Sequence, residues 1–257
     1  MQNQTTNNAP PEYAVVLTSC GRFDLLRQTV RSFLQFADIP PAQFIIVEDS
    51  GDEKVRDALA DLDFAFEFAV HSRMGQAKSI DAGYARVRTP FIFHCEDDWE
   101  FFRTSFIAES FALLSRFPKA SAVMLRGRDE HRLLRKLSAE EADGVRFFRV
   151  PCGAHLRYFG YGYNPGMRRL ADYKRIAPFA EVGGEMHVSF VFQQLGFYTA
   201  HLEIPAVCHL GWGRRIQNAA KTSRIQKKII RYKDKLKILR WLIFGIPKKW
   251  RNPSGEK

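Results

Sequence analysis

Apolar segments of strand length alternate with amphipathic segments through the first half of the chain. Residues 13–19 and 43–47 are apolar, β-branched runs that end in polar residues, which is typical of buried strands. Between them, apolar side chains recur at helical spacing after Asp24, which predicts a helix that Asp24 caps and that stops at Pro40. The alternation continues with strands expected at 64–70, 90–95 and 121–126 and helices at 75–84 and 103–116.

This alternation of strands and helices predicts an α/β fold built from βαβ units, with a mostly parallel sheet flanked by helices. In open sheets of this kind, ligands bind beyond the carboxyl ends of the strands. Polar clusters follow three of the expected strands at those ends: Thr18-Ser19, Glu48-Asp49 and Glu96-Asp97-Asp98. We therefore expect the three clusters to converge on one crevice.

The second half of the chain has a less regular pattern. Residues 127–180 are rich in Arg, Gly, Tyr and Phe and predict no regular elements. Residues 184–196 are expected to form a helix, and residues 197–209 a strand that leads to His209. There is neither an internal repeat nor a low-complexity segment, so a solenoid or a fibrous protein is excluded.

The net charge of +11 is confined to the end of the chain. Residues 1–213 contain 24 Lys and Arg against 26 Asp and Glu, a net charge of −2, whereas residues 214–257 contain 15 against 2, a net charge of +13. The body is therefore slightly acidic, and nucleic acid is not its expected partner. A basic tail can meet an anionic surface, or it can be a solvated helix face.

The basic tail also has a helical apolar pattern. Spacings of 4, 3, 4, 3 and 4 residues place one apolar set on a single helix face: Ile225, Ile229, Tyr232, Leu236, Leu239 and Ile243. Gly245 and Pro247 end this helix, and Trp241 and Trp250 lie near its end. A basic amphipathic helix with tryptophan fits an anchor on an anionic membrane surface. The alternative is a helix that packs its apolar face on the domain.

The cysteines and the amino-terminal residues indicate a cytoplasmic protein. Cys20, Cys95, Cys152 and Cys208 are far apart and form no CxxC pair, so we expect reduced thiols and no zinc cluster. Residues 1–12 are polar and lack the apolar core of a secretory signal, so we expect a disordered segment. No apolar run approaches the roughly 18 residues that a membrane span requires.

The acidic run at Glu96-Asp97-Asp98 is the strongest candidate for chemistry. Adjacent carboxylates at the end of a buried strand repel one another, and a divalent cation relieves that repulsion. Mg²⁺ in proteins takes one or two carboxylates and completes its octahedron with phosphate oxygens and water. The run therefore predicts a site for Mg²⁺ or Mn²⁺ and a phosphorylated ligand, with a solvated acidic turn as the alternative.

Three segments resemble the first half of family 2 glycosyltransferases, which have the GT-A fold: VVLTSCGRFDLLRQTVRSFL, IIVEDSGD and GQAKSIDAGYARVRTPFIFHCEDDW. The resemblance covers residues 13–100 and continues more weakly to about residue 213. It implies a GT-A-like domain that transfers sugar, with inversion, from a nucleoside diphosphate sugar to an acceptor hydroxyl. A bacterial cell-surface glycan or glycolipid is the acceptor that the family suggests.

The resemblance also assigns roles at the donor site. Asp98 matches the family's metal ligand, with Glu96 and Asp97 beside the metal or on the ribose and phosphate. Thr18, with Ser19 beside it, matches the contact to the nucleotide base. Asp49 matches the acceptor of a hydrogen bond from the base or ribose, which favours uracil, and a turn cap is its alternative role. Arg73 and Lys78 match the turn near the diphosphate, and a solvated helix charge is the alternative role of each.

In the second half, the stretch GGEMHVSFVFQQLGF resembles the family's second acidic motif. Glu185 is the expected general base, and His187 is a second candidate. His209 is expected to bind the metal or the diphosphate. Five further residues fit two roles equally well, a platform of rings on which the acceptor sugar stacks or packing in the core: His155, Tyr158, Tyr161, Tyr163 and Trp212.

The sequence thus predicts a disordered segment at 1–12, a GT-A-like glycosyltransferase domain at 13–213 and a basic amphipathic helical tail at 214–257. The expected location is the cytoplasm, with the tail on the inner face of the membrane. A nucleotidyltransferase is the rival enzyme, although the turn after the first strand lacks a Gly-rich phosphate loop. A non-catalytic module that binds membrane or nucleic acid is the rival from another class.

Overall fold

The computed structural model describes residues 11–130, 134–150, 160–211 and 224–251. Its strands are β1 (Tyr13–Ser19), β2 (Gln43–Glu48), β3 (Phe66–Val70), β4 (Phe91–Glu96), β5 (Trp99–Phe101), β6 (Ala120–Met124), β7 (Glu140–Ala142), β8 (Val145–Val150), β9 (Gly166–Arg169), β10 (Tyr198–Leu202) and β11 (Val207–His209). Its α-helices are α1 (Phe23–Phe36), α2 (Val55–Leu59), α3 (Gln76–Tyr84), α4 (Phe106–Arg116), α5 (Leu170–Ile176), α6 (Phe179–Val182), α7 (Glu185–Gln194), α8 (Arg224–Phe244) and α9 (Lys248–Arg251).

The expected α/β sheet is present, and it combines parallel with antiparallel pairs. Its strand order is β3-β2-β1-β4-β9-β6-β10-β8-β7, and β11 and β5 pair in a separate two-stranded ribbon. Strands β3, β2, β1 and β4 are parallel, and Thr18 of β1 lies opposite Val47 of β2 and Glu96 of β4. Every residue of β1 and β2 is buried, as expected for parallel strands covered on both faces. The carboxyl ends of these strands are therefore aligned at one edge.

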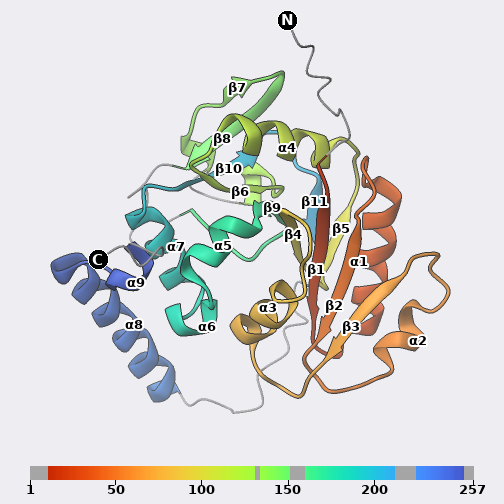
Figure 1. Cartoon of the computed structure of the whole chain (residues 1–257), viewed down its shortest axis with the longest axis horizontal. Helices are drawn as coiled ribbons and strands as arrows, with labels where there is room; N and C mark the ends of the chain where they lie inside the picture. The colour runs from red at the N-terminus through yellow and green to blue at the C-terminus, as the bar shows by residue number, and fades with distance from the viewer. Residues whose placement is uncertain (1–10, 131–133, 151–159, 212–223, 252–257) are drawn as a thin grey trace, which may run out of the picture.

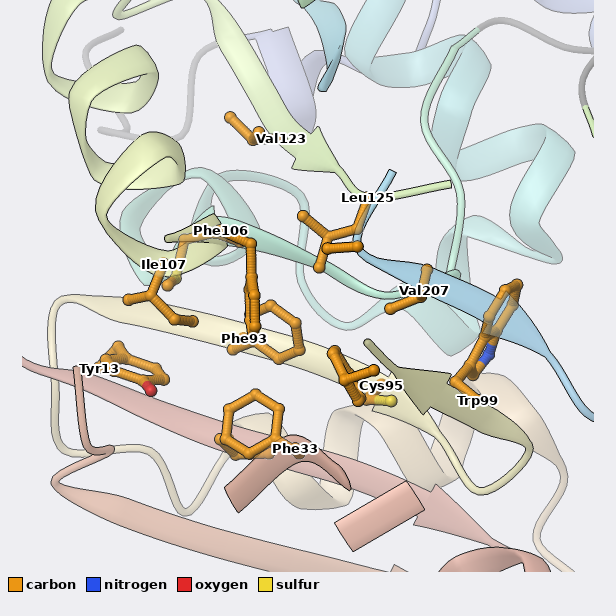
Figure 2. Close-up of a cluster of buried hydrophobic side chains, with 14 of the residues drawn as sticks. Tyr13, Phe33, Phe93, Cys95, Trp99, Phe106, Ile107, Val123, Leu125 and Val207 are labelled. Carbon is orange, nitrogen blue, oxygen red and sulfur yellow. The ribbon is translucent and has the colours of Figure 1, made fainter. Parts of the chain in front are cut away.

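Helices cover both faces of the sheet (Figure 1). One core lies between the sheet and α1, α4 and the β5–β11 ribbon; in it Phe33 of α1 packs against Phe93 and Phe101, as Figure 2 shows for Phe33 and Phe93. The other core lies between the sheet and α3, α5, α6, α7 and α8. At Gly83 of α3 a Cβ would overlap Val16, so only glycine lets this helix approach the sheet so closely.

The expectation that residues 127–180 are irregular is wrong. They contain strands β7 to β9, helices α5 and α6, and two short 3₁₀ turns, Arg128–Glu130 and Leu134–Lys136. Strand β9 is only four residues long and runs antiparallel between β4 and β6. Its sequence, GMRR, does not alternate between apolar and polar residues. Both arginines nevertheless donate hydrogen bonds to groups inside the protein. A short strand of this composition carries no strand signal.

Two further boundaries differ from the sequence expectation. Arg22, and not Asp24, occupies the N-cap position of α1, and Asp24 lies in the first turn. The preceding turn is instead held by Glu48, whose carboxylate accepts hydrogen bonds from the backbone N–H groups of Gly21 and Ser50. The strand expected at 197–209 is divided into β10 and β11 by a segment that contains Pro205, which cannot donate to a ladder.

Helix α8 packs on the domain through a face other than the predicted one. Ile238 and Trp241 are buried against the second core, with Trp241 stacked on Phe190 at 6.0 Å between ring centroids. In the predicted set, Leu239 and Ile243 are exposed by 50% and 65%. In Figure 1 the helix runs along the outside of α6 and α7. Among the described helices, none is both long and apolar enough to cross a membrane.

Candidate active site

A cavity of about 540 Å³ lies beyond the carboxyl ends of β1, β2 and β4. Thr18 and Ser19 end β1, Asp49 follows β2, and Glu96 ends β4 with Asp97 and Asp98 directly after it. All of these residues line the cavity. The predicted convergence of three polar clusters is therefore confirmed. The remaining wall residues are Cys20, Arg22, Gln76, Ser79, Trp99, Arg126, Asn164 and His209.

The acidic cluster is buried and held by one guanidinium group. Asp97 and Asp98 are 1% and 7% exposed. Arg22 donates through Nη1 to Asp98 Oδ2 at 2.8 Å and through Nη2 to Asp97 Oδ1, and Ser19 Oγ donates to Asp97 Oδ2 at 3.1 Å. Buried charges need such partners. Arg22 supplies one positive charge to two carboxylates, so these contacts leave an excess of negative charge.

That excess changes the protonation of the cluster. Burial, together with the negative charges of Asp98 and Glu185, raises the pKa of Glu96 to about 8. Burial also raises the pKa of Asp97 to about 6, although Arg22 acts in the opposite direction. Perturbed carboxylates in a cleft are typical of a functional site. The solvated acidic turn that the sequence left open is therefore excluded for this cluster.

The β5–β11 ribbon brings His209 to the acidic cluster. His209 pairs in register with Trp99, and its Nε2 lies 3.3 Å from Asp98 Oδ2. The next residue but one, Gly211, lies so close to Asp98 that a Cβ there would overlap the carboxylate. Leu210 also donates its backbone N–H to the Asp98 carbonyl at 2.8 Å. The sequence-distant ribbon therefore fixes the position of Asp98.

Asp98 and His209 together fit a divalent cation. Within the described ranges, no three His, Cys, Asp or Glu side chains form a metal cluster by themselves. Mg²⁺ usually binds proteins through one or two carboxylates and takes phosphate oxygens and water as its other ligands. One carboxylate and one imidazole beside an open polar cavity suit that coordination. Glu96 lines the same cavity but already accepts hydrogen bonds from Gln76 and Trp99.

The residues expected at the nucleotide lie at the cavity wall. Thr18 is 9% exposed and Ser19 is 4% exposed. Asp49 accepts hydrogen bonds from the backbone N–H groups of Met74 at 2.6 Å and Gly75 at 2.8 Å, so it caps the turn that begins α3. Asp49 therefore caps a turn, which was the alternative role that its sequence position allowed, and it also lines the cavity.

Glu185 begins α7 near the cavity without lining it. The backbone of Tyr163 hydrogen-bonds to its carboxylate, and burial raises its pKa. The loop of residues 160–165 that contacts Glu185 is itself held by buried Arg168, which donates to Tyr161 Oη at 2.9 Å and to the Asn164 carbonyl at 3.2 Å. Glu185 also interacts electrostatically with Glu96, which places it beside the acidic cluster.

Other candidates lie elsewhere. Arg73 and Lys78 are exposed around the start of α3 and do not line the cavity. His187 is buried against Trp241, with Nε2 at 3.8 Å from Asp234 of α8, so it faces the tail and is wrongly placed for a base. Tyr161 and Tyr163 are core residues, 2% and 1% exposed, which favours the packing interpretation. Three further candidates lie outside the described residues: His155, Tyr158 and Trp212.

Two arginines of the cavity wall, Arg22 and Arg126, were not predicted from the sequence. Arg22 follows the first strand, where a basic residue beside Gly21 was available as a signal. Arg126 lies beyond β6, and its guanidinium is 5.2 Å from the centroid of the Trp99 ring. Both line the cavity, so its wall carries two cations as well as its carboxylates.

Comparison with solved structures identifies similar folds. A mannosyltransferase from Pyrobaculum calidifontis, PcManGT, solved with GDP-Man and Mn²⁺, matches with a TM-score of 0.58 at 12% identity over 77% of this chain and 56% of that one. GalNAc-T7 with UDP, GalNAc and Mn²⁺ matches with a TM-score of 0.57 at 11% identity over 79% and 44%. S. aureus TarS with UDP-GlcNAc matches with a TM-score of 0.54 at 11% identity over 76% and 57%.

These matches identify the fold as GT-A-like, as the sequence resemblance implied. The chain spans about half the length of the first two structures. No protein-family model matches the sequence, and no curated protein matches it. Identities this low carry the fold and not the activity, so function has to be argued from the site.

Proposed function

We propose that this chain is a metal-dependent glycosyltransferase of the family 2 type, which moves a sugar from a nucleoside diphosphate sugar to an acceptor hydroxyl. The observation that carries the proposal is the pairing of buried Asp98 with His209 at the mouth of the strand-end cavity. Three of the structures with a similar fold were solved with a nucleotide or nucleotide sugar, two of them together with Mn²⁺.

The sugar donor would lie in the cavity, in contact with the residues of its wall. Thr18, Ser19 and Asp49 would contact the nucleoside, and a carboxylate acceptor there favours the uracil N–H of a UDP sugar. Asp98 and His209 would hold Mn²⁺ or Mg²⁺, with Glu96 and Asp97 beside it. A bound divalent cation neutralises charge on a departing diphosphate.

Besides the metal ion, positively charged side chains would face the diphosphate. We assign this role to Arg22 and Arg126, which line the cavity, in preference to Arg73 and Lys78, which do not. A guanidinium matches phosphate oxygens in a bidentate geometry. Arg22 currently binds both Asp97 and Asp98, so it would exchange part of that contact for the diphosphate.

Glu185 is the proposed general base. Burial raises the pKa of its carboxyl group, which makes the carboxylate a stronger proton acceptor. Removal of the acceptor hydroxyl proton by Glu185 would allow a single displacement at the anomeric carbon, with inversion. We further propose a hexosyl donor and a bacterial cell-surface glycan or glycolipid acceptor, reached from the cytoplasmic face.

The test is a thermal-shift screen of UDP, GDP, dTDP and CMP, each with and without Mn²⁺, followed by release of nucleoside diphosphate from the matching sugar donors. Ligand that binds the native state raises its stability. We expect one diphosphate to give a metal-dependent shift in the wild type, and Asp98→Asn to remove it. Exposed Asp63 supplies the control, Asp63→Asn, which should keep the shift.

Two outcomes would redirect the proposal. In a parallel screen with UTP, GTP, dTTP and CTP, a metal-dependent shift together with pyrophosphate release would indicate a nucleotidyltransferase. A folded protein that shifts with none of the nucleotides would favour the non-catalytic binding module.

A further inference from the structure

Helix α8 carries an apolar stripe that the rest of the domain does not cover. Its described members are 45–65% exposed: Ile229, Tyr232, Leu236, Leu239 and Ile243. They recur every three or four residues, so they lie on one line along the helix. We call this line the outer stripe.

The outer stripe faces away from the protein. Ile238 and Trp241, which bury α8 against α7, lie on roughly the opposite side of a helix with 3.6 residues per turn. Lys237 reinforces that attachment by donating its Nζ hydrogen to the Val182 carbonyl at 2.7 Å. The helix is therefore fixed to the domain by one apolar face while a second apolar face points to solvent.

Cations border the outer stripe on both sides. Lys233 and Arg240 lie along one border and Lys235 along the other, and all three are exposed. Between residues 229 and 251 the chain has eight Lys or Arg residues and a single acidic residue, Asp234. Asp234 lies toward His187 on the buried side, at 3.8 Å.

A hollow lies on the other side of α8, the side of Trp241. It is lined by the buried Trp241 and Trp250, by several cations, among them Arg240, and by Glu181, which pairs with Lys249. The stripe itself carries an aromatic side chain, Tyr232, which is 64% exposed. An apolar line with an aromatic residue and cations along its borders is the composition of helices that lie in a membrane interface.

Charge complementarity decides the occupant. A second copy of this helix would bring Lys233, Lys235 and Arg240 against identical cations with no carboxylate to pair them, and like charges across an interface oppose association. A bilayer with anionic headgroups offers acyl chains to the stripe and negative charge to both borders.

We propose that the outer stripe of α8 docks the domain on an anionic membrane surface, with the helix lying in the plane of the interface. The fixed attachment of α8 then sets the orientation of the whole domain on the bilayer. This inference is independent of the proposed catalytic activity, because no residue of the stripe lines the strand-end cavity.

The test is co-sedimentation of the full chain with vesicles of phosphatidylcholine alone or with 30 mol% phosphatidylglycerol. We expect binding to the anionic vesicles only. Leu236→Glu with Leu239→Glu should lower partitioning at least tenfold, because two carboxylates replace apolar contacts at the acyl boundary. Lys233→Ala with Lys235→Ala should lower it on the order of 25-fold, at about 1 kcal/mol per cation.

The matched control carries the same chemical change on the body. Phe102 and Ile204 are exposed apolar residues outside the tail, and Phe102→Glu with Ile204→Glu should leave vesicle binding unchanged. Circular dichroism verifies the fold of every variant. Wild type that stays in the supernatant with anionic vesicles at low salt would overturn the proposal, as would equal binding by the Leu236 and Leu239 variant. A stripe substitution that changes only the oligomeric mass would identify a second copy as the occupant.

Discussion

Glu96 titrates at an unusual pH, and this has a measurable effect on the stability of the protein. Burial, reinforced by Asp98 and Glu185, raises the pKa of its carboxyl group from 4.5 to about 8. The fold therefore binds this proton more tightly than the unfolded chain does. The associated stability is fully present below about pH 4.5 and is lost as the pH rises toward 8.

The size of this effect follows from linkage. Between pH 4 and pH 8, a carboxyl group with these two pKa values destabilises the native state by about 4 kcal/mol, since one pKa unit corresponds to about 1.36 kcal/mol. At pH 5 the same group costs less than about 1 kcal/mol. Glu96→Gln cannot ionise, so it should remove the loss at pH 8. Its one amide oxygen can accept from Trp99, and the Gln76 amide can turn so that its oxygen accepts from the new NH2 group.

The assay is urea unfolding of the metal-free protein at pH 5 and pH 8, followed by tryptophan fluorescence. We expect Glu96→Gln to be more stable than wild type at pH 8 by up to about 4 kcal/mol, and nearly equal to it at pH 5. Glu67 supplies a control of opposite sign, because Arg88 lowers the pKa of its carboxyl group. Glu67→Gln should therefore bring no gain at pH 8.

Two results would refute this reasoning. If Glu96→Gln is no more stable than wild type at pH 8, the ionised Glu96 carboxylate does not destabilise the native state. If the gain is the same at pH 5 and pH 8, it comes from packing and not from ionisation.

Three other substitutions test the geometry of the site and its support. Arg22→Gln leaves Asp97 and Asp98 without their cation, so it should lower metal-free stability by about 2 kcal/mol, and saturating Mn²⁺ should restore part of the loss in urea titrations. Gly211→Ala forces the Asp98 carboxylate aside, so calorimetry should show weakened Mn²⁺-dependent nucleotide binding with the fold retained. Gly83→Ala pushes α3 off the sheet and should cost about 1–3 kcal/mol in thermal unfolding without changing nucleotide affinity in the folded protein.

The first half of the fold was predictable because its strands are buried on both faces. Each of β1, β2 and β4 is a continuous apolar run that ends abruptly in polar residues, so position along the chain already indicated position in the sheet. The convergence of Thr18, Asp49 and Asp98 follows from parallel pairing alone, and the structure confirms it.

Features that depend on side-chain direction were not predictable. The reach of Arg22 and Arg126 into the cavity is set by the turn geometry around them, which local spacing does not encode. The sequence around Tyr161 is the same whether its ring is exposed for a sugar to stack on or buried. The structure shows that it is a core residue, because its hydroxyl accepts a hydrogen bond from the buried guanidinium group of Arg168. In α8 both the stripe and the pair Ile238 and Trp241 satisfy helical periodicity, so the pattern could not decide which face is buried.

Strand β9 follows β4 and β6 in the chain but lies between them in the sheet, and this order affects folding. Residues 166–169 occupy the position between β4 and β6, so neither strand has a neighbour on that side until β9 has been synthesised. Before then, a nascent chain that ends after β6 leaves one edge of β4 and both edges of β6 unpaired, because β10 also follows later in the chain. Unpaired edges of apolar strands are templates for aggregation. The sheet therefore closes through contacts between residues far apart in sequence, and such topologies fold slowly. Truncations after residue 124 should accordingly form inclusion bodies, and the full chain should depend on chaperones during synthesis.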